Sequence, residues 1–439
     1  MRISRLAVLI LTAASVAACS HRSAGDPSPD RKTAGQKALP SAEFALGYQA
    51  GKQGGELEIA RVQGELRARP GRAGDYARLA QAFLQRERET ADSSYAAYAE
   101  DALMAAEARD PRDPEVMTAS ILRLHQEHRF VQARDAAQKL IAAAPDRSIG
   151  FLLLGDALLE LGDYGAATDA YQTALDKMPD LRSYSRGGYI RWLNGDVDGA
   201  LQLMEQALQA AGPHGREPAA WCYVEVGDML RRRGKYRAAV NAAERALGLV
   251  PGYVPAHALR ARVRVHLGQR DEAIAELGEV VTRRPTAEHL LLLADLLDQA
   301  GRASESAARV AEAEKLAARD PLPLAAYYAR HQQVPERALS LAERAVSERP
   351  SIFALDAEAL AYLRAGRVAD AQGAIARALR LDTPSADLHI HRGLIELAAG
   401  DRKAAAASLT RARTIEPDAD PVLVAELERG LAGRKETKR

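Results

Sequence analysis

The amino-acid sequence predicts an all-α fold built from repeated helix-turn-helix units. Apolar residues recur at helical spacing, and glycines and prolines punctuate them at similar intervals from about Gly55 to Pro417. No stretch alternates between apolar and polar residues over enough positions to indicate a strand. The composition suits Ala- and Leu-rich helices in close contact, since 47% of the residues are hydrophobic and only 5% are aromatic. In such an array each unit packs on its neighbours, so 439 residues need no single central core.

The most regular unit runs from Ser148 to Pro179. Apolar residues at helical spacing come first, a turn follows at Gly162, and a second apolar stripe ends at the proline. Small residues at Gly155 and Ala167 allow two antiparallel helices to approach closely, because a longer side chain at either point would hold the backbones apart. Proline cannot continue the second helix, so the unit ends there.

This spacing resembles the tetratricopeptide repeat, whose unit has about 34 residues. The resemblance implies a right-handed superhelical solenoid of about ten repeats, in which the first helices of the repeats line a concave face. Further copies of the pattern contain Gly188, Gly195 and Ala200; Tyr223, Gly227, Gly234 and Pro251; Gly268, Ala273 and Pro285; Ala294, Gly301 and Ala313; Ala359, Gly366 and Ala371; and Gly393, Gly400, Ala405 and Pro417.

The pattern divides the chain into four segments. Residues 1–18 are expected to form a signal peptide, 19–42 a flexible tether, 43–432 the repeat solenoid and 433–439 a basic tail. Within the solenoid we expect a leading half-repeat at 55–70, full repeats at 74–419 and a capping helix at 421–432, because a stack of repeats needs a cap at both ends. The tether is rich in Gly, Pro and charged residues and has little apolar surface to bury.

Three units depart from the regular pattern. The unit from about Gly74 to Pro111 is longer, and its extra residues, Arg86–Tyr95, lengthen either the helices or the loop between them. Gly212–Pro218 lengthens a connection, which we interpret as a long loop and not a domain boundary because the repeat resumes at once. A later unit has His331–Pro335 where a glycine turn is expected.

The amino terminus predicts export and lipid attachment. Arg2 and Arg5 precede an apolar run at residues 6–18, which is too short for a membrane span of roughly 20 residues. The run closes on Val-Ala-Ala-Cys, which resembles the lipobox of bacterial lipoproteins and implies acylation of Cys19. The alternative is an ordinary signal peptide with an incidental cysteine. Ser20 replaces the aspartate of an inner-membrane retention signal, which favours the outer membrane in a Gram-negative cell.

Charge and side-chain chemistry argue against several classes of function. Removing residues 1–18 takes away two arginines, so the formal charge moves from +1 to −1 and the mature chain has no whole-molecule attraction to nucleic acid. Cys222 then has no disulfide partner and is expected to be a small hydrophobe in a helix. The pair His125 and His128 fits no zinc motif, and His389 and His391 point apart around a helix. We therefore predict no enzymatic activity, cofactor or metal.

The candidate binding site lies on the first helices of the central units, which carry both tryptophans of the chain, Trp192 and Trp221, together with several arginines. Trp, Tyr and Arg dominate binding energy at interfaces. The alternative is that the tryptophans fill gaps between helices. By the resemblance, the concave face presents Ser185, Tyr189 and Trp192 in one repeat, Val224, Asp228 and Arg231 in the next, and Ala258 and Arg262 in the one after.

These features predict a lipid-anchored, extracytoplasmic scaffold that holds a protein partner, as an extended peptide or a helix, in its concave groove and serves in envelope assembly or export. Two alternatives stay open. One is a glycan- or polysaccharide-binding lipoprotein, because tryptophan faces also stack on sugar rings. The other is a contact activator of a cell-wall enzyme. A preference of the arginine-rich groove for acidic peptides would favour the first prediction.

Overall fold

The structure, a computed structural model, describes residues 40–52, 54–212 and 215–433. Helices and short connections make up these residues, and no strand occurs among them, so the all-α prediction is confirmed. The predicted signal peptide, Cys19, nearly all of the tether and most of the basic tail lie outside the described residues. No helix in the three described ranges is long and apolar enough to cross a membrane.

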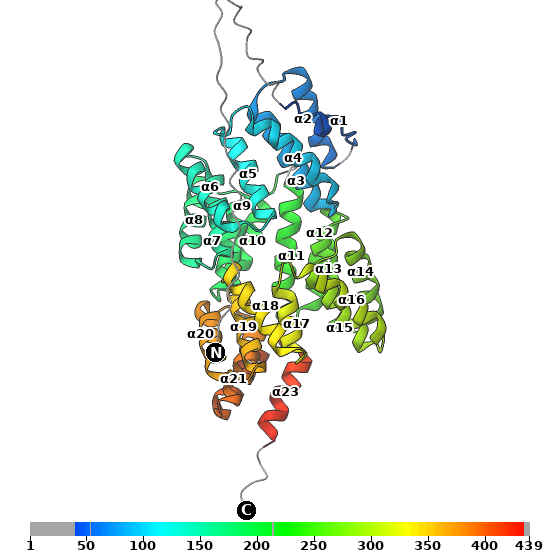
Figure 1. Ribbon diagram of the computed structural model, residues 1–439, viewed down its shortest axis with the longest axis vertical. Coiled ribbons are helices and arrows are strands. Elements are labelled where there is room, and N and C mark those ends of the chain that lie inside the picture. Colours follow the sequence, from blue (N-terminus) through cyan, green and yellow to red (C-terminus); the bar gives the residue numbers. More distant parts are fainter. Residues whose placement is uncertain (1–39, 53, 213–214, 434–439) are drawn as a thin grey trace, which may run out of the picture. The chain divides into compact units, whose positions relative to one another are not determined.

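The helices follow one another as pairs, each packed against the pair before it (Figure 1). Their bounds are α1 Glu43–Gly47, α2 Glu56–Ala68, α3 Ala73–Thr90, α4 Ser94–Glu107, α5 Pro114–Gln126, α6 Phe130–Ala143, α7 Ser148–Glu160, α8 Tyr164–Lys177, α9 Leu181–Leu193, α10 Val197–Gln209, α11 Arg216–Arg232, α12 Tyr236–Leu249, α13 Val254–His266, α14 Arg270–Arg283, α15 Ala287–Gln299, α16 Ala303–Leu316, α17 Leu322–Arg330, α18 Pro335–Glu348, α19 Ile352–Arg364, α20 Val368–Ala378, the 3-10 turn Leu379–Leu381, α21 Ala386–Ala398, α22 Arg402–Ile415 and α23 Pro421–Ala432.

The regular unit has the predicted form. Helix α7 ends at Glu160, the chain turns at Gly162 with φ +72°, and α8 follows. Gly155 explains the close packing of the two helices, because a Cβ there would lie only 2.4 Å from Cε1 of Tyr171 on α8. The predicted close approach is therefore confirmed, and it makes room for an aromatic ring. Later units turn in the same way on Gly195, Gly234, Gly268, Gly301, Gly366 and Gly400, all with positive φ.

The irregular units differ from the regular unit in the length of a helix or in the form of a turn. In the first full unit the extra residues extend α3 to 18 residues, so the lengthening is in the helix and not in the loop. In the unit with His331–Pro335, α17 has only nine residues, and the turn uses left-handed backbone at Gln332 (φ 55°) and Val334 (φ 37°). The long connection ends earlier than expected, because α11 begins at Arg216 and takes Pro218 into its first turn.

The core is divided into several clusters along the array, and the largest of them runs from α13 to α23. The expected capping helices are present as α2 and α23, and a short helix before them, α1, was not predicted. Cys222 is fully buried on α11. Burial raises the pKa of its thiol to about 12. The predicted position of Cys222, buried in a helix as a small hydrophobe, is confirmed.

Candidate functional site

Three consecutive first helices present polar and aromatic side chains that contact one another. On each helix these residues are spaced by three or four positions, which places them on one face. We call the set the central stripe; it consists of Asp156 and Glu160 on α7, Arg182, Arg186 and Tyr189 on α9, and Trp221, Glu225, Asp228 and Arg232 on α11.

Trp221 lies at the middle of the central stripe. The guanidinium of Arg186 lies 5.5 Å from the centre of its ring, and the ring of Tyr189 lies 6.2 Å away. Arg186 is held in place by Asp156, which accepts from its Nε and Nη2 at 3.2 Å each and from the hydroxyl of Tyr171 at 2.8 Å. Trp221 itself is only half-buried. A partly accessible indole with a fixed cation and a fixed phenol beside it is a suitable anchor for a partner.

The residues predicted for the concave face divide into two groups. Ser185, Trp192, Arg231 and Ala258 are buried, whereas Tyr189, Val224, Asp228 and Arg262 are half-buried. Trp192 is 6% exposed, packs in the core between α9 and its neighbours, and has the guanidinium of Arg232 5.5 Å from its ring centre. This burial agrees with the alternative left open from the sequence, in which the tryptophan fills a gap between helices. The binding role of the eight residues stays a prediction.

Three arginines of this region, Arg231, Arg232 and Arg262, are already paired within the chain. Arg231 forms an ion pair with Glu416, and Arg262 forms one with Glu288. Asp228 accepts from Nε of Arg231 at 2.8 Å and from Nε of Arg232 at 2.7 Å. Burial acts to raise the pKa of Asp228, but the neighbouring guanidiniums outweigh it and hold this pKa far below its usual range. The expected arginine-rich surface is therefore largely neutralised.

Two charged side chains of the central stripe differ from the rest. Within the described part of the chain, the side chains of Arg182 and Glu225 form no hydrogen bond or ion pair. Burial, with the carboxylate of Asp228 nearby, raises the pKa of Glu225 to about 8. At neutral pH this carboxyl group is therefore mostly protonated and can donate a hydrogen bond.

Replacing Glu225 by Gln is expected to remove a pH dependence of stability. Between the unfolded pKa of about 4 and the folded pKa, the folded chain holds a proton that the unfolded chain has released, so the free energy of unfolding falls as pH rises through this window. Because the side chain is only half-buried, we expect Glu225→Gln to be about 1–3 kcal/mol more stable than wild type at pH 9 and nearly equal to it at pH 4. Denaturant unfolding over this pH range measures the difference.

Glu205 supplies the control, since it is exposed on α10 away from the stripe. Glu205→Gln should leave the pH profile of unfolding unchanged. An equal profile for wild type and Glu225→Gln would show that Glu225 ionises normally.

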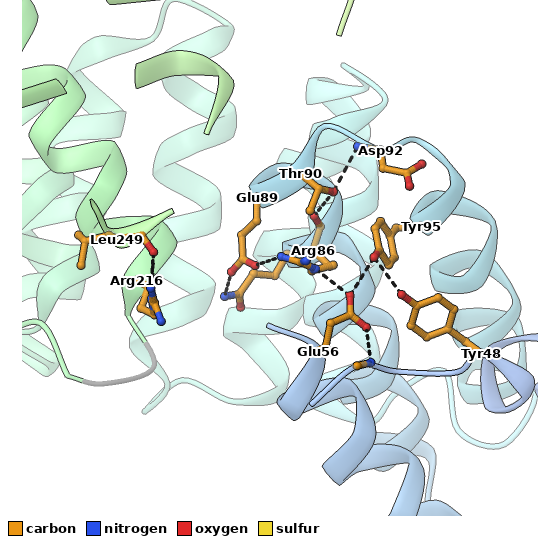
Figure 2. A network of polar contacts seen from close by, with 11 residues as sticks. Tyr48, Glu56, Arg86, Glu89, Thr90, Asp92, Tyr95, Arg216 and Leu249 are labelled. Atoms are coloured by element: carbon orange, nitrogen blue, oxygen red, sulfur yellow. Dashed lines mark hydrogen bonds and ion pairs between the residues drawn. The ribbon is translucent and has the colours of Figure 1, made fainter. Parts of the chain in front are cut away.

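A second polar cluster lies at the amino-terminal end (Figure 2). The Glu56 carboxylate accepts from the Tyr95 hydroxyl at 2.8 Å and from Nε of Arg86 at 2.8 Å, and the Tyr48 and Tyr95 hydroxyls are 2.9 Å apart. Arg86 also donates to Glu89 at 3.1 Å. Although burial acts to raise the pKa of Glu56, these donors lower it. The cluster fastens α1 and α2 onto the first full repeat, and its groups satisfy one another.

A shallow cavity of about 360 Å³ opens beside this cluster, lined by Glu43, Phe44, Gly47, Tyr48, Gln49 and Tyr98. Phe44 is 54% exposed and stacks on Tyr98 with ring centres 4.2 Å apart. One face of the Phe44 ring is therefore covered by Tyr98, and much of the ring is open to solvent. The sequence analysis did not single out this surface.

His125 and His391 have structural contacts. Nε2 of His125 lies 3.1 Å from the carbonyl oxygen of Leu153, and Nδ1 of His391 lies 2.7 Å from the carboxylate of Asp356. Burial alone would lower the pKa of His391, yet Asp356 raises it above its ordinary value. Among the described residues, no group of three or more His, Cys, Asp or Glu side chains is arranged to hold a metal ion.

Comparison with known families decides what the repeats are. Family models described as tetratricopeptide repeat match residues 230–290 and, in a second case, residues 126–187, 152–216 and 357–421. These segments of the chain are similar to the tetratricopeptide repeat. They include α7–α10, most of α19 and all of α20–α22, so the first helices of the central stripe lie within a matched segment.

Curated relatives match over shorter stretches. Tetratricopeptide repeat protein 36 of Homo sapiens is 30% identical over 119 residues, which is 27% of this chain and 62% of that protein. Its Bos taurus counterpart is 35% identical over 91 residues, 20% of this chain and 48% of that protein. The matches thus span less than two thirds of either relative.

Several solved structures are similar to this chain, each with a TM-score below 0.5. A human IFIT1 dimer with PPP-AAAA is 16% identical, with a TM-score of 0.47 over 74% of this chain and 78% of that one. The APC/C hetero-tetramer Cut9–Hcn1 is 17% identical, with a TM-score of 0.46 over 86% and 76%. A thermophilic tetratricopeptide repeat protein of Thermus thermophilus is 27% identical, with a TM-score of 0.35 over 46% and 98%.

From the sequence, Trp192 was expected on the concave face, and it stayed open whether the tryptophans face the groove or fill gaps between helices. The structure buries Trp192 and leaves Trp221 half-buried. Of the central stripe, the predicted concave face included Tyr189 and Asp228 but not Trp221, Arg186 or Glu225. The signal was present in the spacing, because Trp221, Glu225, Asp228 and Arg232 share one face of α11.

Proposed function

We propose that this protein is a scaffold that binds a protein partner through the central stripe, at the extracytoplasmic side of a membrane to which it is anchored. The observation that carries the proposal is the half-buried Trp221 between Arg186 and Tyr189. Tetratricopeptide repeats are interaction modules that hold partners without chemistry of their own, and their solenoids offer extended surfaces for this purpose. Envelope assembly or export is the process in which we expect this scaffold to serve.

Loss of partner capture by Trp221→Ala tests the binding site. Because anchor residues at interfaces contribute about 2 kcal/mol or more, we expect the variant to hold its partner at least about 30-fold more weakly. The measurement is cross-linking in intact cells, identification of the captured protein, and titration of the purified pair.

Tyr223→Ala is the matched control, since Tyr223 lies on the same helix, is half-buried, and contacts Arg245 and not the stripe. It should capture the partner normally. A partner bound equally well by wild type and Trp221→Ala would place the binding surface elsewhere.

The anchor is proposed from the sequence, where Cys19 follows an apolar run that resembles a lipoprotein signal. Two or more acyl chains would give stable attachment, where a single chain gives only reversible binding. We expect a fatty-acid analogue to label the wild-type protein and to spare Cys19→Ala. Equal labelling of both would contradict lipid attachment at this residue.

Glycan binding is a second candidate, and the cavity beside Phe44 is the observation that favours it. An exposed aromatic ring with Glu43 and Gln49 at its edge suits a sugar ring, which stacks on the aromatic face and hydrogen-bonds to the polar rim. Binding of purified wall or capsule polymer without any protein partner, abolished by Phe44→Ala and kept in Trp221→Ala, would favour this candidate over the first.

A further inference from the structure

The turns of three consecutive repeats contact a second row of repeats much later in the chain. The turns that follow α7, α9 and α11 meet the connections that precede α19, α21 and α23. We call these three contacts the seam. Each row advances by one repeat from one contact to the next.

The first contact joins the turn at Gly162 to the start of α19. The backbone N–H of Ile352 donates to the hydroxyl of Tyr164 at 3.0 Å, and both residues are buried. A Cβ at Gly162 would lie 2.4 Å from the carbonyl oxygen of Pro350, so the two backbones touch. Arg380 adds a hydrogen bond to the carbonyl oxygen of Gly162 at 3.0 Å.

The second contact joins the turn at Gly195 to the connection before α21. The hydroxyl of Thr383 donates to the carbonyl oxygen of Leu193 at 2.6 Å, and Thr383 is buried. A Cβ at Gly195 would lie 3.1 Å from the carbonyl oxygen of Asp382. The end of α9, one of the helices that carry the central stripe, therefore contacts a distant part of the chain.

The third contact joins the end of α11 to the connection before α23. Arg231 is buried with Glu416 in an ion pair, and Nη1 of Arg232 lies 3.7 Å from the same carboxylate. The hydroxyl of Tyr236 donates to the carboxylate of Asp418. Glu416 thus pairs with two arginines, Arg231 and Arg232, at the end of the central stripe.

The four interactions that define the seam join residues 188, 190, 185 and 182 positions apart. This near-constant separation means that the two rows meet in register. The polar contacts are made by turns and helix ends, whereas neighbouring repeats pack helix against helix. Apolar contact accompanies them, because Ile352, Phe353 and Leu381 of the second row join the hydrophobic cluster of α7–α11. Opening the seam would therefore leave the packing inside every repeat intact.

We propose that the seam is a reversible latch, whose three contacts open and close together and whose opening frees Arg231 and Arg232 from Glu416. In the closed state Glu416 acts as an internal substitute for an acidic side chain of a partner. In the open state the arginine pair is available to such a side chain. The binding of a partner's acidic side chain by the freed arginines rests on the proposed function. The concerted opening of the seam does not, and it can be tested on the protein alone.

Hydrogen exchange at the amide of Ile352 reports directly on the latch. Ile352 is the first residue of α19, so its N–H has no partner within the helix, and in the described part of the chain it donates to Tyr164 across the seam. Glu416→Gln weakens the opposite end of the seam. If the three contacts open as a unit, the variant should exchange the Ile352 amide about tenfold faster or more than wild type, in the full chain without a partner.

Glu426→Gln is the matched control, because Glu426 forms a bidentate ion pair with Arg364 within the second row. Nη1 and Nη2 of Arg364 donate to its carboxylate at 2.6 and 2.8 Å. It should change exchange at Ile352 by less than about twofold. Tyr236→Phe, which removes only the hydrogen bond to Asp418, should give a smaller acceleration and tests the latch even if Glu416→Gln fails to fold. Unchanged exchange at Ile352 in Tyr236→Phe or in a folded Glu416→Gln would overturn concerted opening, and so would equal acceleration in Glu426→Gln.

Discussion

Trp192→Ala is expected to lower the free energy of unfolding by about 3–5 kcal/mol. The indole is 6% exposed and belongs to the core cluster around α9, with Arg232 over its face. Truncation would leave a cavity that its neighbours fill only in part, and it would remove the ring beneath the guanidinium. Denaturant unfolding followed by the fluorescence of the remaining Trp221 measures the change.

Trp221→Ala is the natural comparison, because it removes the same side chain from a half-buried position on the next repeat. We expect it to lower stability by only about 1–2 kcal/mol, since less apolar surface leaves contact with the protein. A loss below about 1 kcal/mol for Trp192→Ala, or a larger loss for Trp221→Ala, would mean that the roles of the two tryptophans are reversed.

Gly155→Ala is expected to destabilise the protein by about 2–3 kcal/mol, although alanine is the better helix former. The new Cβ would lie 2.4 Å from Cε1 of Tyr171, which is 3% exposed and tied through its hydroxyl to Asp156. The ring has nowhere to move, so α7 and α8 must separate. Thermal or denaturant unfolding of the variant gives the loss.

The opposite result is expected for Gly165→Ala in the same unit. A Cβ at Gly165, in the first turn of α8, has nothing within 4 Å. The substitution should therefore stabilise the fold by about 0.5–1 kcal/mol through helix propensity. If both variants gained stability, the close approach of α7 and α8 at Gly155 would be refuted.

Because the seam already pairs Arg231, this arginine is a poor choice for testing whether the central stripe binds a partner. Charge substitutions at Arg231 affect the pair with Glu416 as well as any partner, because the arginine is 9% exposed and already neutralised. Removing one member of a buried pair leaves the other charge uncompensated. Trp221 is the better residue for testing binding, since the guanidinium and the phenol beside its ring come from the adjacent helix α9 and it has no charge to leave uncompensated.

The helices and their turns could be predicted from the sequence, because the signals that fix them are local. A glycine that adopts positive φ and a proline that ends a helix act within a few residues, as at Gly162 and Pro179. Where these signals were missing, the prediction was less definite. The extra residues after Arg86 allowed either a longer helix or a longer loop, and only packing shows that α3 continues.

The sequence by itself determined the repeat, the positions of its helices and the helices that carry the candidate site. The tertiary structure alone decided which tryptophan is covered and which charges are already paired. Trp192 and Trp221 lie on the first helices of consecutive repeats, and their burial depends on the neighbours that pack on each. Glu416 lies 185 residues from Arg231, and no local spacing rule links two side chains at that distance. Their pairing depends on the total rotation that accumulates over the repeats between them. Helix propensity and turn chemistry do not determine that rotation.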